Sequence, residues 1–238
     1  MIFYYIRHGD PIYDPDSLTA LGKEQAQAVA KRLSGHGFDR IYSSTSQRAI
    51  DTARPTCEIL KKTPELLDFC HETYVWNDFS VETEEGKRIW AFSDGEISKL
   101  FASCEMRNLG DRWYEHESFS GKNFKAGIER VYNETDKFFK SLGYEHERYT
   151  GRYQCISPTT ERVALFAHQG FGLVFLSCLL DIPYPAFSTH FDMTHTGVTV
   201  INFEQNGEYC IPKVLTLSSE AHIYAEGLPM KYNNTIDI

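Results

Sequence analysis

A short run of apolar, β-favouring residues opens the chain at residues 2–6. A run that is apolar at every position is typical of a strand buried on both faces in a parallel sheet. After two prolines, Thr19 is placed to cap a helix through about Leu33, with its apolar residues at helical spacing. The chain therefore begins with a strand followed by a helix.

The same strand–helix order is repeated along the chain. Residues 38–43 read as a second strand, followed by a helix at about 46–61. Far downstream, the sequence predicts a third strand at residues 162–167, a turn at Gly170 and a helix at residues 171–180. Segments 198–203 and 209–217 resemble an antiparallel pair joined at Asn206-Gly207. This order predicts a three-layer α/β/α fold with a mostly parallel central sheet.

Residues 73–160 differ in character from the segments on either side. They hold all three tryptophans and most of the charge runs, and an apolar stripe predicts a helix at 124–142 that ends at Gly143. We interpret this stretch as a largely helical insertion, or lid, in a single domain that spans residues 1–238. Its aromatic residues are expected either to stack on a flat or sugar-like leaving group or to pack a small core of the insertion.

Composition excludes several classes of protein. With 42% hydrophobic and 14% aromatic residues, the 238-residue chain can bury a large core, and its net charge of −9 argues against a general role on nucleic acid. Six cysteines without a CxxC pair favour free thiols, and thus a cytoplasmic protein. No stretch approaches the ~20 apolar residues of a membrane helix. Oligomeric state is left open.

Basic side chains follow all three predicted parallel strands. Arg7 and His8 close the first strand, Arg48 follows the second, and His168 follows the third. Because the carboxyl ends of parallel strands share one edge of the sheet, we expect these groups to meet there. Planar, permanently charged guanidinium groups suit phosphate oxygens. The pattern predicts a site for a small phosphorylated substrate.

Four sequence blocks in this order resemble the histidine phosphatase (phosphoglycerate mutase-like) superfamily, and the resemblance covers residues 1–72 and 161–222. Taken alone, an Arg-His-Gly tripeptide is common, so the order of the blocks matters more than any one of them. The blocks are Ile6-Arg7-His8-Gly9, Leu18-Thr19-Ala20-Leu21-Gly22, the run from Ile41 to Ala53 that contains Arg48, and Ala167-His168-Gln169-Gly170.

The resemblance implies phosphoryl transfer through His8, and elementary chemistry agrees. Nearby arginines should lower the pKa of His8 and keep its imidazole neutral for attack. Arg7, Arg48 and His168 would bind the phosphoryl oxygens, with His168 best protonated when a dianion is bound. Gly9 would give room for the phosphate or for an unusual φ.

The proton donor is expected shortly after the second helix. Glu72, four residues before Trp76, fits the family pattern best, and Asp68 is the alternative. A nearby apolar wall would help such a carboxyl group to hold a proton at neutral pH.

The expected activity is hydrolysis of a phosphate monoester through a phosphohistidine on His8. The alternatives are a mutase-type phosphotransferase and a non-catalytic phosphate-binding module. The mechanism needs no metal or other cofactor, and a metal site at His190, Asp192 and His195 is disfavoured. We expect His116 and His146 to be solvated and His222 to serve packing.

Overall fold

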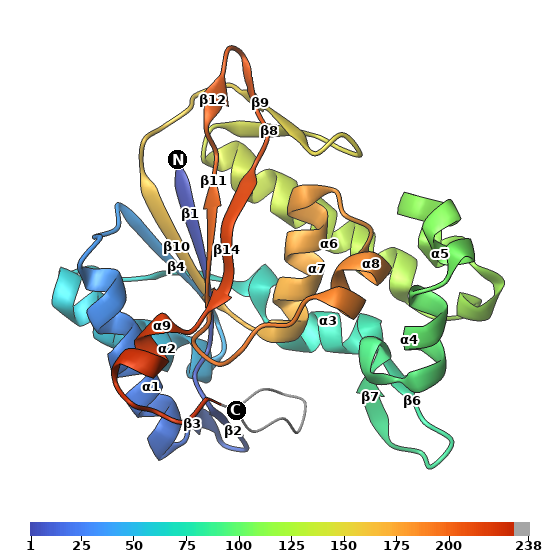
Figure 1. Ribbon diagram of the computed structural model, residues 1–238, viewed down its shortest axis with the longest axis horizontal. Helices are drawn as coiled ribbons and strands as arrows, with labels where there is room; N and C mark the ends of the chain where they lie inside the picture. Colours follow the sequence, from blue (N-terminus) through green and yellow to red (C-terminus); the bar gives the residue numbers. More distant parts are fainter. Residues whose placement is uncertain (231–238) are drawn as a thin grey trace.

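The central sheet of the computed structural model, which describes residues 1–230, contains six strands. Four of them are parallel neighbours, and β11 is antiparallel to the strands on both its sides. The α/β prediction is thereby confirmed (Figure 1). In spatial order the strands are β14 (Lys213–Ser219), β11 (Val198–Asn202), β1 (Ile2–Arg7), β10 (Arg162–Ala167), β4 (Arg40–Ser44) and β5 (Glu65–Leu67).

The side chains of β1 alternate between two hydrophobic cores, one on each face of the sheet. Phe3 and Tyr5 face a core that includes residues of α6 (Phe124–Ser141) and α7 (Gln169–Leu180). Tyr4 and Ile6 face a second core with residues of α1 (Ala20–Ser34) and α2 (Gln47–Leu60). Because both faces are covered, β1 is apolar from Ile2 to Ile6 rather than alternating. As expected, Thr19 caps α1 by accepting a hydrogen bond from the Gly22 backbone N–H.

The segment at 73–160 is mostly helical in the structure. Its helix α6 packs beside α7 against the sheet, while α4 and α5 extend outward (Figure 1). Trp113 is buried in a cluster with Phe101, Phe119 and Phe124. This residue therefore packs a core of the insertion, which was the second of the two roles expected for its aromatic residues. The elements are α3 (Glu72–Phe79), β6 (Ser80–Glu82), β7 (Arg88–Trp90), α4 (Gly95–Phe101), α5 (Cys104–Leu109), α6, β8 (Tyr144–Glu147) and β9 (Arg152–Cys155).

The C-terminal hairpin differs from the prediction. β11 and β14 are antiparallel as expected, but the Asn206-Gly207 turn joins a separate pair of short strands, β12 (Gln205–Asn206) and β13 (Tyr209–Cys210). β13 pairs with β9 in a second, four-stranded sheet. Pro212 separates β13 from β14 and has no N–H to donate, so the predicted continuous strand is interrupted there.

The side chain of His146 is buried, and the expectation that it is solvated was wrong. Its Nδ1 lies 2.8 Å from Asp136 Oδ1, its Nε2 lies 3.1 Å from Asp181 Oδ2, and its ring stacks on Tyr153. Burial alone would lower the pKa of His146, but the two carboxylates outweigh burial and raise it. The His146 imidazole, with its protonated form favoured, thus joins β8 to α6 and to the end of α7. The nearby charged residues were visible in the sequence, but their convergence on one ring was not.

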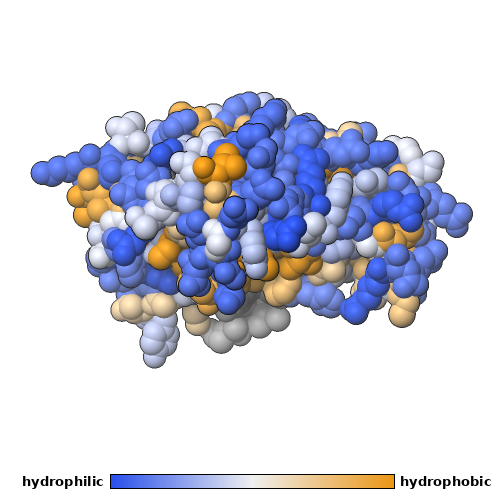
Figure 2. Space-filling view, turned by 90° about the horizontal axis from the view of Figure 1, so that it is seen from above, coloured by the Kyte–Doolittle hydropathy of each residue, from blue (hydrophilic) through white to orange (hydrophobic). Residues whose placement is uncertain are grey.

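The face of the molecule seen in Figure 2 is mainly hydrophilic. In the view of Figure 2, apolar residues form small, separated patches among polar ones. Within residues 1–230, no helix combines the length and the apolar character needed to cross a membrane.

We predict that His146→Gln lowers the free energy of unfolding by about 2 kcal/mol at pH 6, the cost of disrupting a buried charged pair. The folded-state pKa of His146 is raised above the ordinary 6.5, so its charge stabilises the fold fully below about pH 6.5. The stabilisation is lost as the pH rises through the folded-state pKa. Urea unfolding at pH 6 and pH 9 measures the difference, with exposed His36→Gln as the control. An equal loss at both pH values would contradict this role.

Candidate active site

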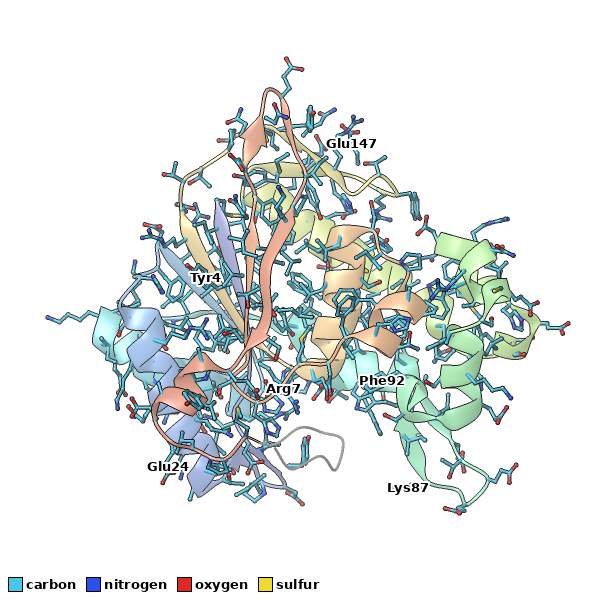
Figure 3. All side chains as sticks on the ribbon, viewed as in Figure 1. Tyr4, Arg7, Glu24, Lys87, Phe92 and Glu147 are labelled. Atoms are coloured by element: carbon cyan, nitrogen blue, oxygen red, sulfur yellow. The ribbon has the colours of Figure 1, made fainter. Side chains whose placement is uncertain are left out.

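Three adjacent strand ends bring the expected residues together. β1, β10 and β4 are neighbours and run parallel, so the residues that follow them meet at one edge of the sheet. His8 follows β1, His168 is the N-cap residue of α7, and Arg48 is the second residue of α2. These side chains and that of Arg7, labelled in Figure 3, are almost fully buried. The edge of the sheet thus holds a cluster of buried basic groups.

His8 is arranged with one defined tautomer. Its Nδ1 lies 2.7 Å from the Gly9 carbonyl oxygen, which only accepts hydrogen bonds. Nδ1 therefore carries the proton, and the Nε2 lone pair is left for a substrate. Burial, followed by the nearby Arg7, His168 and Arg48, holds the pKa of His8 well below its ordinary value. The imidazole is neutral, as the sequence predicted.

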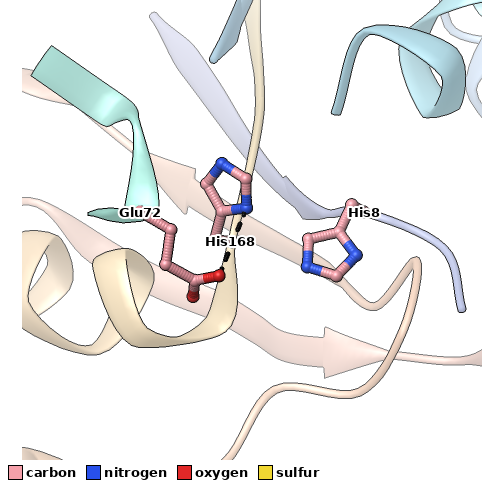
Figure 4. A group of neighbouring side chains, drawn as sticks. All are labelled: His8, Glu72 and His168. Atoms are coloured by element: carbon pink, nitrogen blue, oxygen red, sulfur yellow. Dashed lines mark ion pairs between the residues drawn. The ribbon is translucent and has the colours of Figure 1, made fainter. Parts of the chain in front are cut away.

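Glu72 is the first residue of α3 and lies against both other helices of the site. Its Oε2 is 3.0 Å from Arg48 Nη2 and 3.6 Å from His168 Nδ1, and its Oε1 accepts the Gly170 N–H at 3.0 Å. Figure 4 shows Glu72, His168 and His8 converging from three elements. One ligand-type atom from each of these three residues lies within 4.8 Å of the others. Glu72 is therefore within the cluster that contains His8.

Asp68, the alternative to Glu72, lies elsewhere. It is exposed and accepts hydrogen bonds from the hydroxyl groups of Thr45 and Tyr74. It is not among the carboxylates that contact Arg48 or His168. Of the two candidates, the geometry favours Glu72.

The two arginines are fixed by different partners. Arg7 donates from Nη1 to the Met193 carbonyl oxygen at 2.5 Å, and its Nη2 lies 2.9 Å from His195 Nε2. Arg48 pairs with Asp16 at 2.8 Å and with Glu72. Burial alone would lower the pKa of Arg48, but these two carboxylates outweigh it and raise the pKa. Both guanidinium groups are held in place before any ligand binds.

His168 is neutral in the free protein. Burial, followed by Arg48, His71 and Arg7, holds its pKa well below the ordinary value. Its Nε2 lies 2.8 Å from the Ser44 hydroxyl, and the Tyr5 hydroxyl donates to its carbonyl oxygen at 2.5 Å. The expectation of a protonated His168 concerned the phosphate-bound state and stays a prediction.

Gly9 lies where two backbone segments approach each other closely. A Cβ on Gly9 would lie 2.6 Å from the Gly22 carbonyl oxygen, so the absence of a side chain allows the loop after β1 to approach the start of α1. Gly9 is not among the described glycines with positive φ. Its N–H donates to Thr52 Oγ1 at 3.0 Å, which ties the loop to α2 as well.

Several residues of the site were not identified from the sequence. Asp16, which pairs with Arg48, lies on the hairpin of β2 (Pro11–Tyr13) and β3 (Asp16–Leu18), whose pairing had no sequence signal. Ser44 and Thr52 were within a quoted block without an assigned role. His195, considered from the sequence only as part of a disfavoured metal site, has its ring centroid 5.8 Å from that of His8.

The charge of the site suits an anion better than a cation. His8, Glu72 and His168 are close enough together to hold a metal ion, and among residues 1–230 theirs is the group with that geometry. However, two guanidinium groups face the same space, whereas Glu72 supplies one carboxylate. His195 contacts Arg7, and Asp192 accepts from the Met193 N–H and the Gln169 side chain. The disfavoured metal site at 190–195 therefore gains no support.

Comparison with known proteins bears on these residues directly. The family model described as "Histidine phosphatase superfamily (branch 1)" matches residues 3–95, a segment that contains Arg7, His8, Arg48 and Glu72. The resemblance to the histidine phosphatase superfamily is confirmed. His168 lies outside the matched segment and joins the others through the fold. No curated protein matches the chain in sequence.

Solved structures of several phosphatases share the fold. A phosphoserine phosphatase variant from Entamoeba histolytica, in complex with phosphoserine, has 20% identity and a TM-score of 0.60, covering 93% of this chain and 98% of its own. A mycobacterial glucosyl-3-phosphoglycerate phosphatase in complex with VO3 has 17% identity, a TM-score of 0.59 and coverages of 92% and 99%. The α-ribazole phosphatase of Shigella flexneri has 19% identity, a TM-score of 0.57 and coverages of 92% and 96%. At such identities the likeness establishes the fold.

We predict that Gly9→Ala lowers the free energy of unfolding by about 1–3 kcal/mol, because the new Cβ would collide with backbone that cannot move aside easily. Thermal or urea unfolding measures this loss. Gly95→Ala is the matched control, since a Cβ at Gly95 meets nothing within 4 Å. If Gly9→Ala were as stable as Gly95→Ala, the close approach of the two backbones would not constrain the site.

Proposed function

We propose that this protein hydrolyses phosphate monoesters through a phosphohistidine intermediate on His8. One observation carries the proposal: His8 is buried and neutral, its Nδ1–H is engaged by the Gly9 carbonyl oxygen, and its free Nε2 lies among anion-binding groups. A neutral imidazole with a lone pair is a nucleophile, and fixed guanidinium groups stabilise charge on transferring phosphoryl oxygens.

In the first step, His8 Nε2 attacks the phosphorus atom, forming a P–N bond while the bond from phosphorus to the leaving oxygen breaks. Arg7, Arg48 and His168 donate to the other phosphoryl oxygens. Glu72, paired with Arg48 as a carboxylate in the free protein, takes up a proton from solvent when the phosphoryl group displaces it, and passes that proton to the departing alkoxide. The alcohol leaves, and the phosphoryl group remains on His8.

In the second step, a water molecule attacks the phosphorus atom and the P–N bond breaks. The Glu72 carboxylate, now the base, takes a proton from the water, which restores the carboxyl group. His8 recovers its neutral form, and inorganic phosphate leaves. Transfer to water rather than to a second substrate is supported by the three similar solved structures, all of which are phosphatases. A cytoplasmic location is part of the proposal, supported by six cysteines that are all free.

The direct test is release of phosphate from p-nitrophenyl phosphate and from a panel of phosphorylated metabolites, in the presence of EDTA. We expect wild-type turnover, and a loss of about a thousandfold or more in His8→Ala because the nucleophile is removed. His36→Ala, which removes an exposed histidine, is the control and should retain full activity.

Three results would contradict the proposal. Loss of turnover on addition of EDTA would require a metal. Isomerisation of a substrate without phosphate release would indicate the mutase-type activity. Phosphate binding without turnover would indicate a binding module.

A further inference from the structure

A cavity of about 620 Å³ extends from the proposed phosphoryl site toward the insertion. Arg48 and Glu72 line its inner end, and residues of α3, β7 and the turn that follows line the rest. Since Glu72 is the proposed donor to the leaving oxygen, the alcohol part of the substrate has to lie beside it. This cavity is therefore the space that receives the leaving group, an inference that rests on the proposed function.

Two tryptophans, Trp76 and Trp90, form an aromatic wall of this cavity. The rings of Trp76 and Trp90 meet edge to face with centroids 4.8 Å apart, and Phe92 stacks on Trp90 at 5.7 Å. Trp90 also packs onto Gly170, where an added Cβ would lie 2.4 Å from the indole. Trp90 is thus held against the start of α7, whose Gly170 N–H binds Glu72. In Figure 3, Phe92 lies near α3 and α7, and Lys87 lies farther out in the β6–β7 hairpin.

Arg88 contributes a positive charge to the same cavity. Its Nε donates to Ser80 Oγ at 2.6 Å and its Nη2 donates to the Asn77 carbonyl oxygen at 3.0 Å, so both of these partners are neutral. Its guanidinium lies 5.9 Å from the Trp76 ring. In the part of the chain that the structure describes, no carboxylate forms an ion pair with Arg88. Arg88 is exposed, and its cross-strand partner Glu82 does not form an ion pair with it. On a protein of net charge −9, an arginine of this kind at a cavity favours an anionic ligand group.

The remaining lining residues distinguish between kinds of leaving group. Apart from Arg48, Glu72 and Arg88, the cavity offers hydroxyl groups only from Tyr13, Thr73 and Ser93. A sugar would bury many hydroxyl groups that need partners, whereas a planar ring needs apolar faces. The tryptophan wall and the adjacent Ile89 supply such faces.

We propose that this cavity is a leaving-group subsite for aryl or heteroaryl phosphate monoesters that carry a second anionic group. Trp76 and Trp90 pack against the ring, and Arg88 pairs with the anion. The cavity size is in the ordinary range for ligands of this kind.

The test compares kcat/KM for four substrates at low ionic strength. They are propyl phosphate, phenyl phosphate, 4-carboxyphenyl phosphate and the longer 6-carboxy-2-naphthyl phosphate. Changes caused by a substitution are compared between substrates, so intrinsic differences in leaving-group reactivity cancel. Arg88→Gln is expected to lower kcat/KM about threefold to fivefold for at least one carboxylated substrate, the range for a partly exposed ion pair. Phenyl phosphate should change less than twofold.

Two further variants separate charge and ring packing. Arg88→Lys retains the charge and is expected to keep most of the preference for the carboxylated substrate that Arg88→Gln loses. Trp76→Leu should lower kcat/KM for phenyl phosphate about tenfold relative to propyl phosphate, because the ring contact is lost. Arg112→Gln is the matched control, since it removes one exposed positive charge from the insertion outside the cavity. It should leave every ratio unchanged.

Calorimetric binding to His8→Ala keeps this inference separate from the proposed function. Tighter binding of a carboxylated aryl phosphate than of phenyl phosphate, lost in His8→Ala/Arg88→Gln, supports the subsite even if the wild-type protein does not turn over. Turnover of all four substrates with equal effects of Arg88→Gln would overturn the subsite and leave the hydrolase intact. Equal effects of Arg88→Gln and Arg112→Gln would also overturn it.

Discussion

The site depends on the contacts that the Glu72 carboxylate makes with Arg48 and with the Gly170 N–H. The carboxylate joins the start of α3 to Arg48 of α2 and to the Gly170 N–H at the start of α7, and it lies 3.6 Å from His168 Nδ1. A mostly buried carboxylate is costly unless charged and hydrogen-bonded partners compensate for lost water. Here a guanidinium and a helix N-terminus both do so. The same contacts that stabilise the carboxylate therefore set the positions of the phosphate-binding groups.

This arrangement implies a competition when substrate binds. A phosphoryl group that takes hydrogen bonds from Arg48 replaces Glu72 as its partner on one side, while Asp16 continues to hold the other side. In the proposed mechanism, the released Glu72 takes up a proton and passes it to the leaving oxygen. The insertion is linked to this event through Trp90, which packs onto Gly170. The leaving-group cavity and the proton donor thus share one anchoring point, the first turn of α7.

Much of this architecture follows from local sequence patterns. The apolar run of β1, the Thr19 cap and the basic groups at three strand ends are determined by neighbours in the chain, and the parallel sheet brings them together. Glu72 was preferred to Asp68 by its spacing from Trp76, and the geometry agrees. These features are short-range, or follow from one rule about parallel strands.

The features that the sequence did not reveal depend on contacts between distant segments. Asp16 reaches Arg48 through the pairing of two three-residue strands, which periodicity does not predict. The protonated form of the buried His146 side chain is favoured because Asp136 of α6 and Asp181, the C-cap residue of α7, converge on it. Gly9 is required by the backbone of Gly22, thirteen residues later in the chain. Each of these depends on tertiary packing, for which a single sequence has no local signal.

The most direct measurement of the central claim is capture of the phosphorylated protein. Glu72→Gln is mixed with p-nitrophenyl phosphate, whose leaving group departs without a proton, and quenched in alkali because phosphohistidine is labile in acid. Peptide mass spectrometry then locates the modification. The account predicts one added phosphoryl group on the peptide that contains His8, since the amide that replaces the Glu72 carboxylate cannot activate water to remove it. A phosphoryl group on another residue, or turnover with no phosphorylated species at all, would contradict the account.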